Sequence, residues 1–299
     1  MNELINFLKV SNIAFEENVD AKKLCSFRVG GIARVLIYPK NTDEIKGLYA
    51  YLSENKIKNI LLGKGSNVLI SDLGFDGAVI SLGKMNEIRA DGHRVFAGAG
   101  ASMFSLAVAA EKNSLCGLEF AHGIPGSVGG GVYMNAGAYG GEMCQVIDEV
   151  LCLDIESGEL YTLGNAECDF SYRHSIFKDN KNLIVIGSSF ELSEGDATEI
   201  RARMDELKAS RISKQPLEYP SAGSTFKRPE GYFAGKLIED AGLKGFAIGG
   251  AQVSEKHAGF VINRGGATAK DVKDLILHIQ KTVKEKFNVN LECEVEFVE

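Results

Sequence analysis

The clearest feature of the hydrophobic pattern is a stripe of apolar side chains at helical spacing near the carboxyl terminus. It consists of Val272, Leu275, Ile276, Ile279 and Val283. Thr268, with Asp271 three residues later, is typical of a helix start, so a helix is expected there. Similar spacing or capping signals predict helices around residues 4–8 and at 41–52, 102–113, 198–210 and 232–241.

Apolar runs predict strands at residues 33–38, 59–62, 147–154, 160–163 and 183–190. Residues 289–297 alternate between apolar and polar side chains, which is the period of a strand with one buried face. Residues 63–81 read as strand, turn and strand, whereas a Rossmann unit would place a helix directly after its glycine turn. The order predicts an α+β domain up to about residue 200 and a smaller α/β domain at 205–288.

The composition of the chain limits the kinds of molecule that it could bind and the cell compartment in which it could work. The 299 residues carry a formal net charge of −7, which argues against a general nucleic-acid partner. The six cysteines show no metal-site spacing and suggest reduced thiols in a cytosol. No apolar run is long enough to span a bilayer. A cytoplasmic protein with no membrane partner and no metal is expected.

A dense glycine run lies at residues 122–141, which read HGIPGSVGGGVYMNAGAYGG. Glycine loses much backbone freedom on folding, so such a run must serve positive φ angles or close approaches of the backbone. One interpretation is a backbone cradle for a phosphate-bearing ligand. The other is a tight, buried turn that packs against a sheet.

Two common phosphate motifs are absent. Gly63 and Lys64 lack the earlier glycine that a P-loop requires. Gly98 and Gly100 begin a GxGxxG pattern, but its last position is Met103. A phosphate cradle in this chain is therefore of another type.

Arg173 lies in the sequence YRHS among aromatic and apolar neighbours. Its planar guanidinium suits a carboxylate or phosphate partner, although an exposed loop arginine is an equal alternative. His174 is a candidate base or a structural histidine. Lys256 and His257 are candidate ligand contacts or parts of a solvated loop.

Ser224 lies in SAGSTF, which is not a GxSxG nucleophile elbow, so a hydrolytic serine is not expected. Glu294 is flanked at i±2 by Glu292 and Glu296, and repulsion along one strand face would favour a protonated carboxyl group. A solvated acidic face is the alternative interpretation.

Seven stretches in order resemble the UDP-N-acetylenolpyruvoylglucosamine reductases, flavoenzymes of peptidoglycan precursor synthesis. They span about 270 residues and read FRVGG, GKGSNVLISDLGFDGAVIS, GIPGSVGGGVYMNAGAYG, YRHSIF, PSAGSTFKRP, GGAQVSEKHAGFVIN and LECEVEF. The region between Arg211 and Ser224 lacks room for the tyrosine-bearing loop of one subgroup, so the chain resembles the shorter type.

The resemblance implies an α+β fold with an FAD-binding domain of the vanillyl-alcohol-oxidase/PCMH type. This domain would cover residues 1–204, with subdomains at about 15–82 and 83–200, and would be completed by a strand at 289–299. A smaller α/β substrate-binding domain would cover residues 205–288.

The same resemblance implies site residues. The catalytic residues would be Arg173, Ser224 and Glu294. The FAD-binding residues would be Arg28, Gly63, Gly65, Ser66, Asn67, Gly123, Ile124, Pro125, Gly126, Ser127, Gly129, Gly130, Asn135, Ala136 and Gly137, largely through backbone amides. The substrate would contact Tyr133, Lys214, Lys227 and Arg228.

The implied chemistry has two half-reactions. NADPH, the co-substrate, reduces FAD, and reduced flavin then delivers hydride to a nucleotide-sugar enolpyruvyl ether to give UDP-N-acetylmuramate. Arg173 and Glu294 would stabilise the developing negative charge, and Ser224 would donate a proton. Glu296 stands where some members carry arginine, and Arg228 where asparagine is common. A monomer or weak oligomer is expected.

Two other functions fit parts of the pattern. An FAD oxidase of the same superfamily would use oxygen, and His122 would be the nearest candidate for covalent attachment of flavin. A catalytically silent nucleotide-sugar-binding protein would keep the cradle but show no NADPH turnover.

Overall fold

The computed structural model describes residues 1–299, and contacts divide the chain into two compact units. Unit 1 comprises Met1–Glu17, Val35–Lys64 and Gly77–Ser210, and unit 2 comprises Asn18–Arg34, Gly65–Asp76 and Arg211–Glu299. Each unit is therefore assembled from segments that are far apart in the sequence. The predicted domain boundaries divide the chain differently, and as functional boundaries they stay a prediction.

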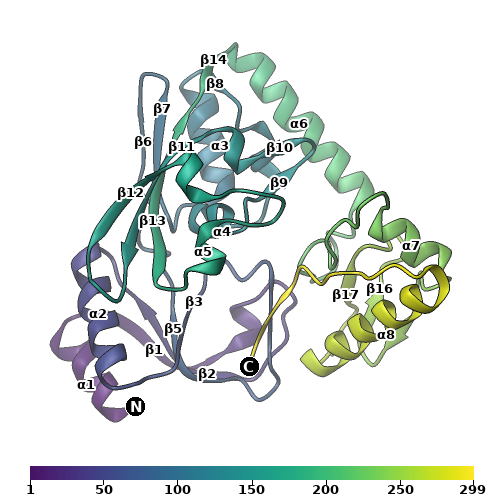
Figure 1. The fold of residues 1–299 in the computed structure, drawn as a ribbon, viewed down its shortest axis with the longest axis horizontal. Helices are drawn as coiled ribbons and strands as arrows, with labels where there is room; N and C mark the ends of the chain where they lie inside the picture. Colours follow the sequence, from purple (N-terminus) through teal and green to yellow (C-terminus); the bar gives the residue numbers. More distant parts are fainter. The chain divides into compact units, whose positions relative to one another are not determined.

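Unit 1 and the strands that run into it contain most of the regular structure (Figure 1). Its helices are α1 (Asn2–Val10), α2 (Thr42–Glu54), α3 (Met103–Lys112), η2 (Glu119–Gly123), α4 (Val128–Tyr133), η3 (Met143–Gln145), η4 (Asn165–Cys168), α5 (Ile176–Asp179) and α6 (Ala197–Lys214). Its strands are β1 (Ala14–Asp20), β2 (Ile32–Tyr38), β3 (Asn59–Leu61), β5 (Phe75–Ile80), β6 (Ile88–Asp91), β7 (Arg94–Gly98), β8 (Leu115–Cys116), β9 (Gly137–Ala138), β10 (Gly141–Glu142), β11 (Ile147–Asp154), β12 (Leu160–Gly164), β13 (Leu183–Glu191) and β14 (Ser193–Glu194).

A five-stranded antiparallel sheet with the order β12-β11-β13-β7-β6 forms the main layer of unit 1. A second sheet has the order β1-β2-β5-β3, in which β3 and β5 are parallel. The glycine-rich α4 packs against β13 of the five-stranded sheet. Val128 and Val132 of α4 are fully buried there.

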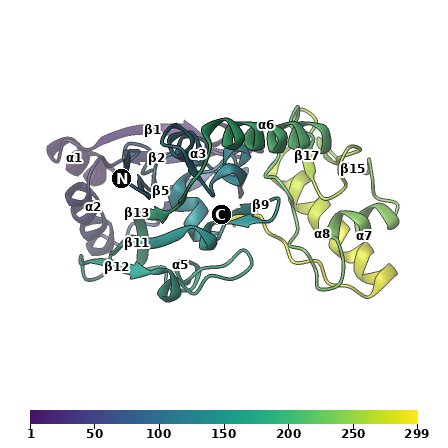
Figure 2. The same cartoon turned by 90° about the horizontal axis from the view of Figure 1, so that it is seen from above.

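Unit 2 has its own hydrophobic core, built around α8 (Ala269–Phe287). The other elements of this unit are η1 (Ala21–Lys23), β4 (Val68–Ile70), α7 (Ala234–Asp240), β15 (Ala247–Ile248), β16 (Ala251–Val253), β17 (Val261–Asn263) and β18 (Glu296–Val298). Helix α8 packs against α7 and against the small sheet β15-β16-β17 (Figure 2). Strand β18 pairs in parallel with β4, so the carboxyl terminus is held by residues 68–70.

Local signals fix the ends of several helices. The Thr268 hydroxyl accepts a hydrogen bond from the Asp271 amide, and the Asp271 carboxylate accepts one from the Thr268 amide. Asp72 adds a second anionic cap, because its carboxylate accepts hydrogen bonds from the amides of Ala269 and Lys270 at 2.8 and 2.9 Å. The predicted starts at Asn41 and Ser102 are confirmed, since each side chain accepts an amide hydrogen bond from the first helical turn.

Two predicted elements differ from the structure. Helix α6 continues to Lys214 instead of ending at residue 210. The predicted strand at 289–297 is wrong for most of its length, because only Glu296–Val298 pairs with a neighbouring strand. Residues 289–295 contribute a single isolated bridge, between Phe226 and Cys293. Among the helices of the chain, none has both the length and the apolarity of a membrane-spanning segment.

The double cap of α8 gives a first prediction. Replacing Thr268 with alanine removes the hydroxyl acceptor and should lower the free energy of unfolding by about 1 kcal/mol. The measurement is urea denaturation followed by circular dichroism, with a lower midpoint and an unchanged slope. Lys281→Ala, at an exposed position in the middle of α8, is the matched control and should change stability by less than about 0.5 kcal/mol. An equal effect of both substitutions would contradict a capping role for Thr268.

Candidate active site

The glycine run folds into η2 and α4 of unit 1. Ser127 is the N-cap of α4, and its hydroxyl accepts a hydrogen bond from the Gly130 amide at 3.3 Å. Several amides of the run bond to the chain itself: those of Val128 and Gly129 donate to the carbonyls of Ala101 and Ala99. These amides hold the loop on residues 99–101, so they are engaged in the fold.

The glycines of this segment serve close packing. A Cβ atom at Gly129 would lie 2.9 Å from the Ala99 Cβ, and one at Gly131 would lie 2.9 Å from the Met103 sulfur. Neither glycine has a positive φ. The interpretation of a tight turn packed against its neighbours therefore accounts for these two positions, and the phosphate contacts of Gly123, Ile124, Pro125 and Gly126 stay predictions.

Gly63 brings the second glycine segment to the same place. A Cβ at Gly63 would lie 2.6 Å from the Ser127 hydroxyl oxygen, so only glycine fits without a shift of Ser127. Two segments that are 64 residues apart in the sequence thus meet within unit 1. This is the arrangement that a cradle made of two loops requires.

Asn135 organises the loop that follows α4. Its side chain is 1% exposed and its φ is +42°, in the left-handed region. The amide group donates to Glu142 and to the Ser171 carbonyl, both at 3.0 Å, and its oxygen accepts from the Cys144 amide. All these bonds join protein segments, so the structure gives Asn135 a structural role; a contact of Asn135 or Ala136 with FAD stays a prediction.

Arg173 lies at the tip of a tight turn in unit 1. Ser171 and His174 exchange two backbone hydrogen bonds, and Arg173 between them has a φ of +58°. A non-glycine residue in this region is strained, and such residues concentrate at functional sites. The guanidinium donates to the Gly137 carbonyl at 3.1 Å and lies over the Tyr172 ring. The turn therefore fixes both the backbone and the head group of Arg173.

Tyr133, the last residue of α4, is close to two ammonium groups. Lys181 donates a hydrogen bond to the tyrosine hydroxyl at 2.9 Å, and the Lys178 ammonium lies 5.2 Å from the ring centre. The Tyr133 carbonyl accepts a hydrogen bond from the buried Ser175 hydroxyl. Sequence reasoning selected Tyr133 but missed both lysines, whose only signal is their position three and six residues after Ser175.

In unit 2, Gly65 and Ser26 form a second close approach of two backbones. Gly65 has a φ of +62°, and a Cβ there would lie 1.8 Å from the Leu24 carbonyl oxygen. The Ser26 amide donates to the Gly65 carbonyl at 2.9 Å. The Ser26 hydroxyl oxygen is buried and has no hydrogen-bond partner. A buried hydroxyl of this kind is available to bond to a polar group of a bound cofactor or to water. Sequence reasoning missed Ser26, although it directly precedes the FRVGG motif.

Ser224 and Glu294 are brought together by backbone pairing in unit 2. The Glu294 amide donates to the carbonyl of Thr225, the residue after Ser224, at 2.9 Å. The Glu294 carbonyl accepts from the Asn67 side chain at 2.9 Å. Ser224 is exposed and follows Gly223, whose φ is +76°. Two residues 70 positions apart therefore share one short stretch of paired backbone.

The acidic residues around Glu294 do not form the regular strand face that the sequence predicts. Glu292 is in an ion pair with Lys227 and lies outside a strand, while Glu296 begins β18. The charge of Glu292 is thus balanced locally, and repulsion along a continuous strand does not describe this segment. Burial, with a smaller contribution from the charge of Glu294, raises the pKa of the neighbouring Cys293 thiol to about 11.

Three further predicted residues lie at exposed positions in unit 2: Arg28, predicted to bind FAD, and Lys214 and Arg228, predicted to contact the substrate. Lys214 ends α6, Arg28 has a φ of +55°, and the Arg228 guanidinium lies 4.0 Å from the Phe233 ring centre. The ligand contacts predicted for these three residues stay predictions. Lys256 donates to the Ile212 carbonyl at 2.7 Å, so its ammonium joins the loop after β16 to the last turn of α6.

Of the three histidines singled out from the sequence, His257 and His122 are packed against other residues of the protein. His257 accepts a hydrogen bond from the Gly259 amide, and burial lowers its pKa. His122 is 7% exposed and its ring lies 4.8 Å from that of Phe104. Burial, together with the positive charge of Lys208, lowers the pKa of His122.

Two protein-family models match this chain. A family model described as an FAD binding domain matches residues 33–164. The model of the UDP-N-acetylenolpyruvoylglucosamine reductase C-terminal domain matches residues 215–298. The two models together cover most of the candidate residues in both units.

Individual relatives match over nearly the whole length. The chain is 52% identical to the UDP-N-acetylenolpyruvoylglucosamine reductase of Clostridium novyi, with 95% of this chain and 92% of that protein covered. It is 49% identical to the Clostridium perfringens reductase, with 100% and 99% covered.

The crystal structure of the Thermus caldophilus reductase superposes with a TM-score of 0.81 at 33% identity, covering 96% of this chain and 99% of that one. These matches confirm the resemblance, the α+β fold with an FAD-binding domain and the enzyme class predicted from the sequence. The chain belongs to the UDP-N-acetylenolpyruvoylglucosamine reductases, the FAD-dependent oxidoreductases that reduce enolpyruvyl-UDP-N-acetylglucosamine in peptidoglycan synthesis.

Proposed function

We propose that this chain draws hydride from NADPH and uses Arg173, Ser224 and Glu294 to turn the enolpyruvyl ether into the lactyl ether of UDP-N-acetylmuramate. The observation that supports this proposal is the hydrogen bond from the Glu294 amide to the carbonyl of Thr225, the residue after Ser224. This reduction needs a proton donor for the substrate carbon that becomes a carbanion. It also needs a positive group that stabilises the negative charge on the adjacent carboxylate of the substrate.

The residues around Gly65 suit FAD. The Ser26 hydroxyl has no partner within the protein and lies in the segment whose backbone pairs with Gly65, so it would be available to a polar group of FAD. Within unit 1, Gly63 and Ser127 are also proposed to contact FAD. When bound, FAD supplies hydride transfer between NADPH and the substrate.

Arg173 would stabilise the negative charge that develops on the substrate carboxylate and the adjacent carbon. Its guanidinium is already ordered by the Gly137 carbonyl and by the Tyr172 ring, so little reorganisation is needed when the charge appears. The strained backbone of the turn is the kind of feature that packing must maintain, which supports a functional role.

Ser224 would deliver the proton to the carbanion centre. A serine hydroxyl is a very weak acid, but a carbanion is a far stronger base, so the transfer is downhill. The positive φ of Gly223 presents Ser224 at an exposed position, and the Thr225 carbonyl ties this loop to Glu294. Glu294, when protonated, would donate to the substrate oxygen that gains charge.

Tyr133 would contact the nucleotide sugar, with Lys178 and Lys181 providing positive charge beside it. A diphosphate is matched by ammonium groups held near a ring that can pack against a sugar or base. Lys227 is already balanced by Glu292, so we expect a smaller share of the substrate's charge to fall on it.

The function is tested by the absorbance spectrum of the purified holoprotein under anaerobic conditions. NADPH should bleach the flavin band, and the enolpyruvyl nucleotide sugar should then restore it. If this substrate did not restore the flavin band, the proposed reduction of the enolpyruvyl ether would be contradicted. Rapid restoration by air alone would indicate an oxidase.

Ser224→Ala separates the two half-reactions. Flavin reduction by NADPH should be unchanged, while reoxidation by the substrate should slow about 10²- to 10⁴-fold, because only the second step needs the proton. Stopped-flow absorbance measures both rates. Ser221→Ala, three residues earlier in the same loop, is the matched control and should leave both rates near wild type. Equal slowing of the two steps in Ser224→Ala would exclude the role of proton donor.

Ser26→Ala tests the cofactor contact in unit 2. Loss of one hydrogen bond worth about 0.5–1.5 kcal/mol should weaken FAD binding roughly 2- to 12-fold. Equilibrium dialysis of the apoprotein against FAD measures this change. Ser53→Ala, at an exposed position in α2, should have no effect. Unchanged FAD affinity in Ser26→Ala would mean that its hydroxyl bonds to something other than the cofactor.

A further inference from the structure

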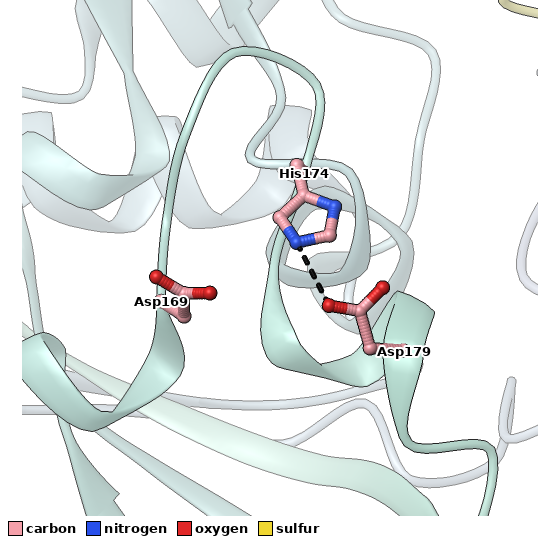
Figure 3. Close-up of side chains that lie close together, drawn as sticks. All are labelled: Asp169, His174 and Asp179. Atoms are coloured by element: carbon pink, nitrogen blue, oxygen red, sulfur yellow. Dashed lines mark ion pairs between the residues drawn. The ribbon is translucent and has the colours of Figure 1, made fainter.

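Asp169, His174 and Asp179 come together in unit 1, and none of the three belongs to the residues assigned above to cofactor or substrate. Their potential ligand atoms, one imidazole nitrogen and two carboxylate oxygens, all lie within 4.8 Å of one another. Figure 3 shows the imidazole with a carboxylate on either side of its lower nitrogen. The His174 Nε2 lies 3.2 Å from an Asp179 oxygen.

Three different backbone features position these side chains. Asp169 follows η4 in the left-handed region with a φ of +46°, and Asp179 is the last residue of α5. His174 closes the turn that begins at Ser171, where two backbone hydrogen bonds hold it. The donor set therefore comes from a short segment whose backbone is fixed at each ligand position.

The negative charges of Asp169 and Asp179 are not balanced by lysine or arginine side chains. Among residues 1–299, neither Asp169 nor Asp179 forms an ion pair with a lysine or arginine, so the two carboxylates share one imidazole. The nearby cations have other contacts: Arg173 donates to Gly137, and the ammonium groups of Lys178 and Lys181 lie at the Tyr133 ring. A bound dication would neutralise the two carboxylates that these side chains leave uncompensated.

We propose that Asp169, His174 and Asp179 bind a divalent transition-metal ion of the Zn²⁺ class, with water completing the coordination. An imidazole with two carboxylates suits Zn²⁺ and its neighbours, whereas Mg²⁺ and Ca²⁺ take oxygen ligands alone. A tetrahedral ion at about 2.0–2.2 Å from each ligand needs them only a little closer together than they are. Both aspartates are exposed and can rotate inwards.

The two buried cysteines of unit 1, Cys152 and Cys168, are poor competitors for the ion at neutral pH. The thiols of Cys152 and Cys168 are buried, and desolvation raises their pKa values to about 11 and about 12. Thiols bind Zn²⁺ as thiolates, so these two stay poor ligands. The proposal also stands independently of the reductase function, because none of the three ligands acts in the reaction proposed above.

The test is calorimetric titration of the tag-free holoprotein with ZnCl₂ in a buffer that does not bind zinc. Wild type should bind one equivalent. His174→Ala should weaken binding at least about 10-fold, and Asp169→Asn should weaken it in the same direction, since each removes one ligand. Retention of the flavin spectrum in both variants shows that they are folded.

His93→Ala is the matched control. His93 is also exposed and lies near a carboxylate, with its Nε2 3.8 Å from Glu194, but it has a single acidic partner. This variant should bind zinc as wild type does. No binding by wild type, unchanged binding by His174→Ala, or displacement of Zn²⁺ by an equal concentration of Mg²⁺ would each overturn the proposal.

Discussion

The pairing of the last residues of the chain with residues 67–71 is the constraint on which the candidate site of unit 2 depends. Strand β18 runs parallel to β4, and Asn67 bonds to both the Glu294 carbonyl and, through its own carbonyl, the Glu296 amide. Glu294 in turn donates its amide to Thr225. One short ladder therefore holds Glu294, the loop that carries the proposed proton donor Ser224, and the predicted FAD-binding residue Asn67 in a single framework.

The interior of this framework is held by buried polar groups that are fully used. The Thr225 hydroxyl is completely buried and accepts the Val261 amide at 3.0 Å. The Asn263 side chain donates to the Phe27 carbonyl at 3.0 Å. Bonds of this kind are costly to break, because each partner would be left buried and unpaired. They give unit 2 a rigid base for side chains that must reach a substrate.

Much of the secondary structure could be predicted because its signals are local. The caps at Asn41, Ser102 and Thr268 lie within three residues of the amides that they satisfy, and the apolar stripe of α8 needs no knowledge of its partner. The strand predicted at 289–297 depends on the positions of residues 68–70 and 226, which the sequence alone does not supply. The alternation of apolar and polar residues predicted correctly that Leu291 and Val295 are buried. It did not predict that both lie outside any strand.

Residues of the candidate site could be predicted only where they belong to a recognisable sequence motif. Arg173, Ser224 and Glu294 follow from the resemblance, but nothing near Ser26 signals that its hydroxyl is left without a partner. The proposed metal site shows the same limit: Asp169 and Asp179 are each five residues from His174, a spacing that no regular element brings to one face. The turn at 171–174 and the short helix α5 create that proximity.

The glycine run at residues 122–141 shows that a high glycine content does not reveal why each glycine is needed. Gly129 and Gly131 are required because neighbouring atoms occupy the space of a side chain, which a density of glycine alone does not reveal. A sequence pattern therefore located the loop correctly, whereas the physical reason for each glycine needed the surrounding atoms.

The division of the chain has a consequence for its synthesis. The backbone passes between the two units five times, and unit 2 combines residues 18–34 and 65–76 with everything after residue 210. At about 5–20 residues per second, Phe27 and Ile70 would wait on the order of tens of seconds for the α8 side chains that bury them. A ribosome that stops within the last ninety residues thus releases a chain with early apolar segments uncovered, a form that chaperones and proteases recognise.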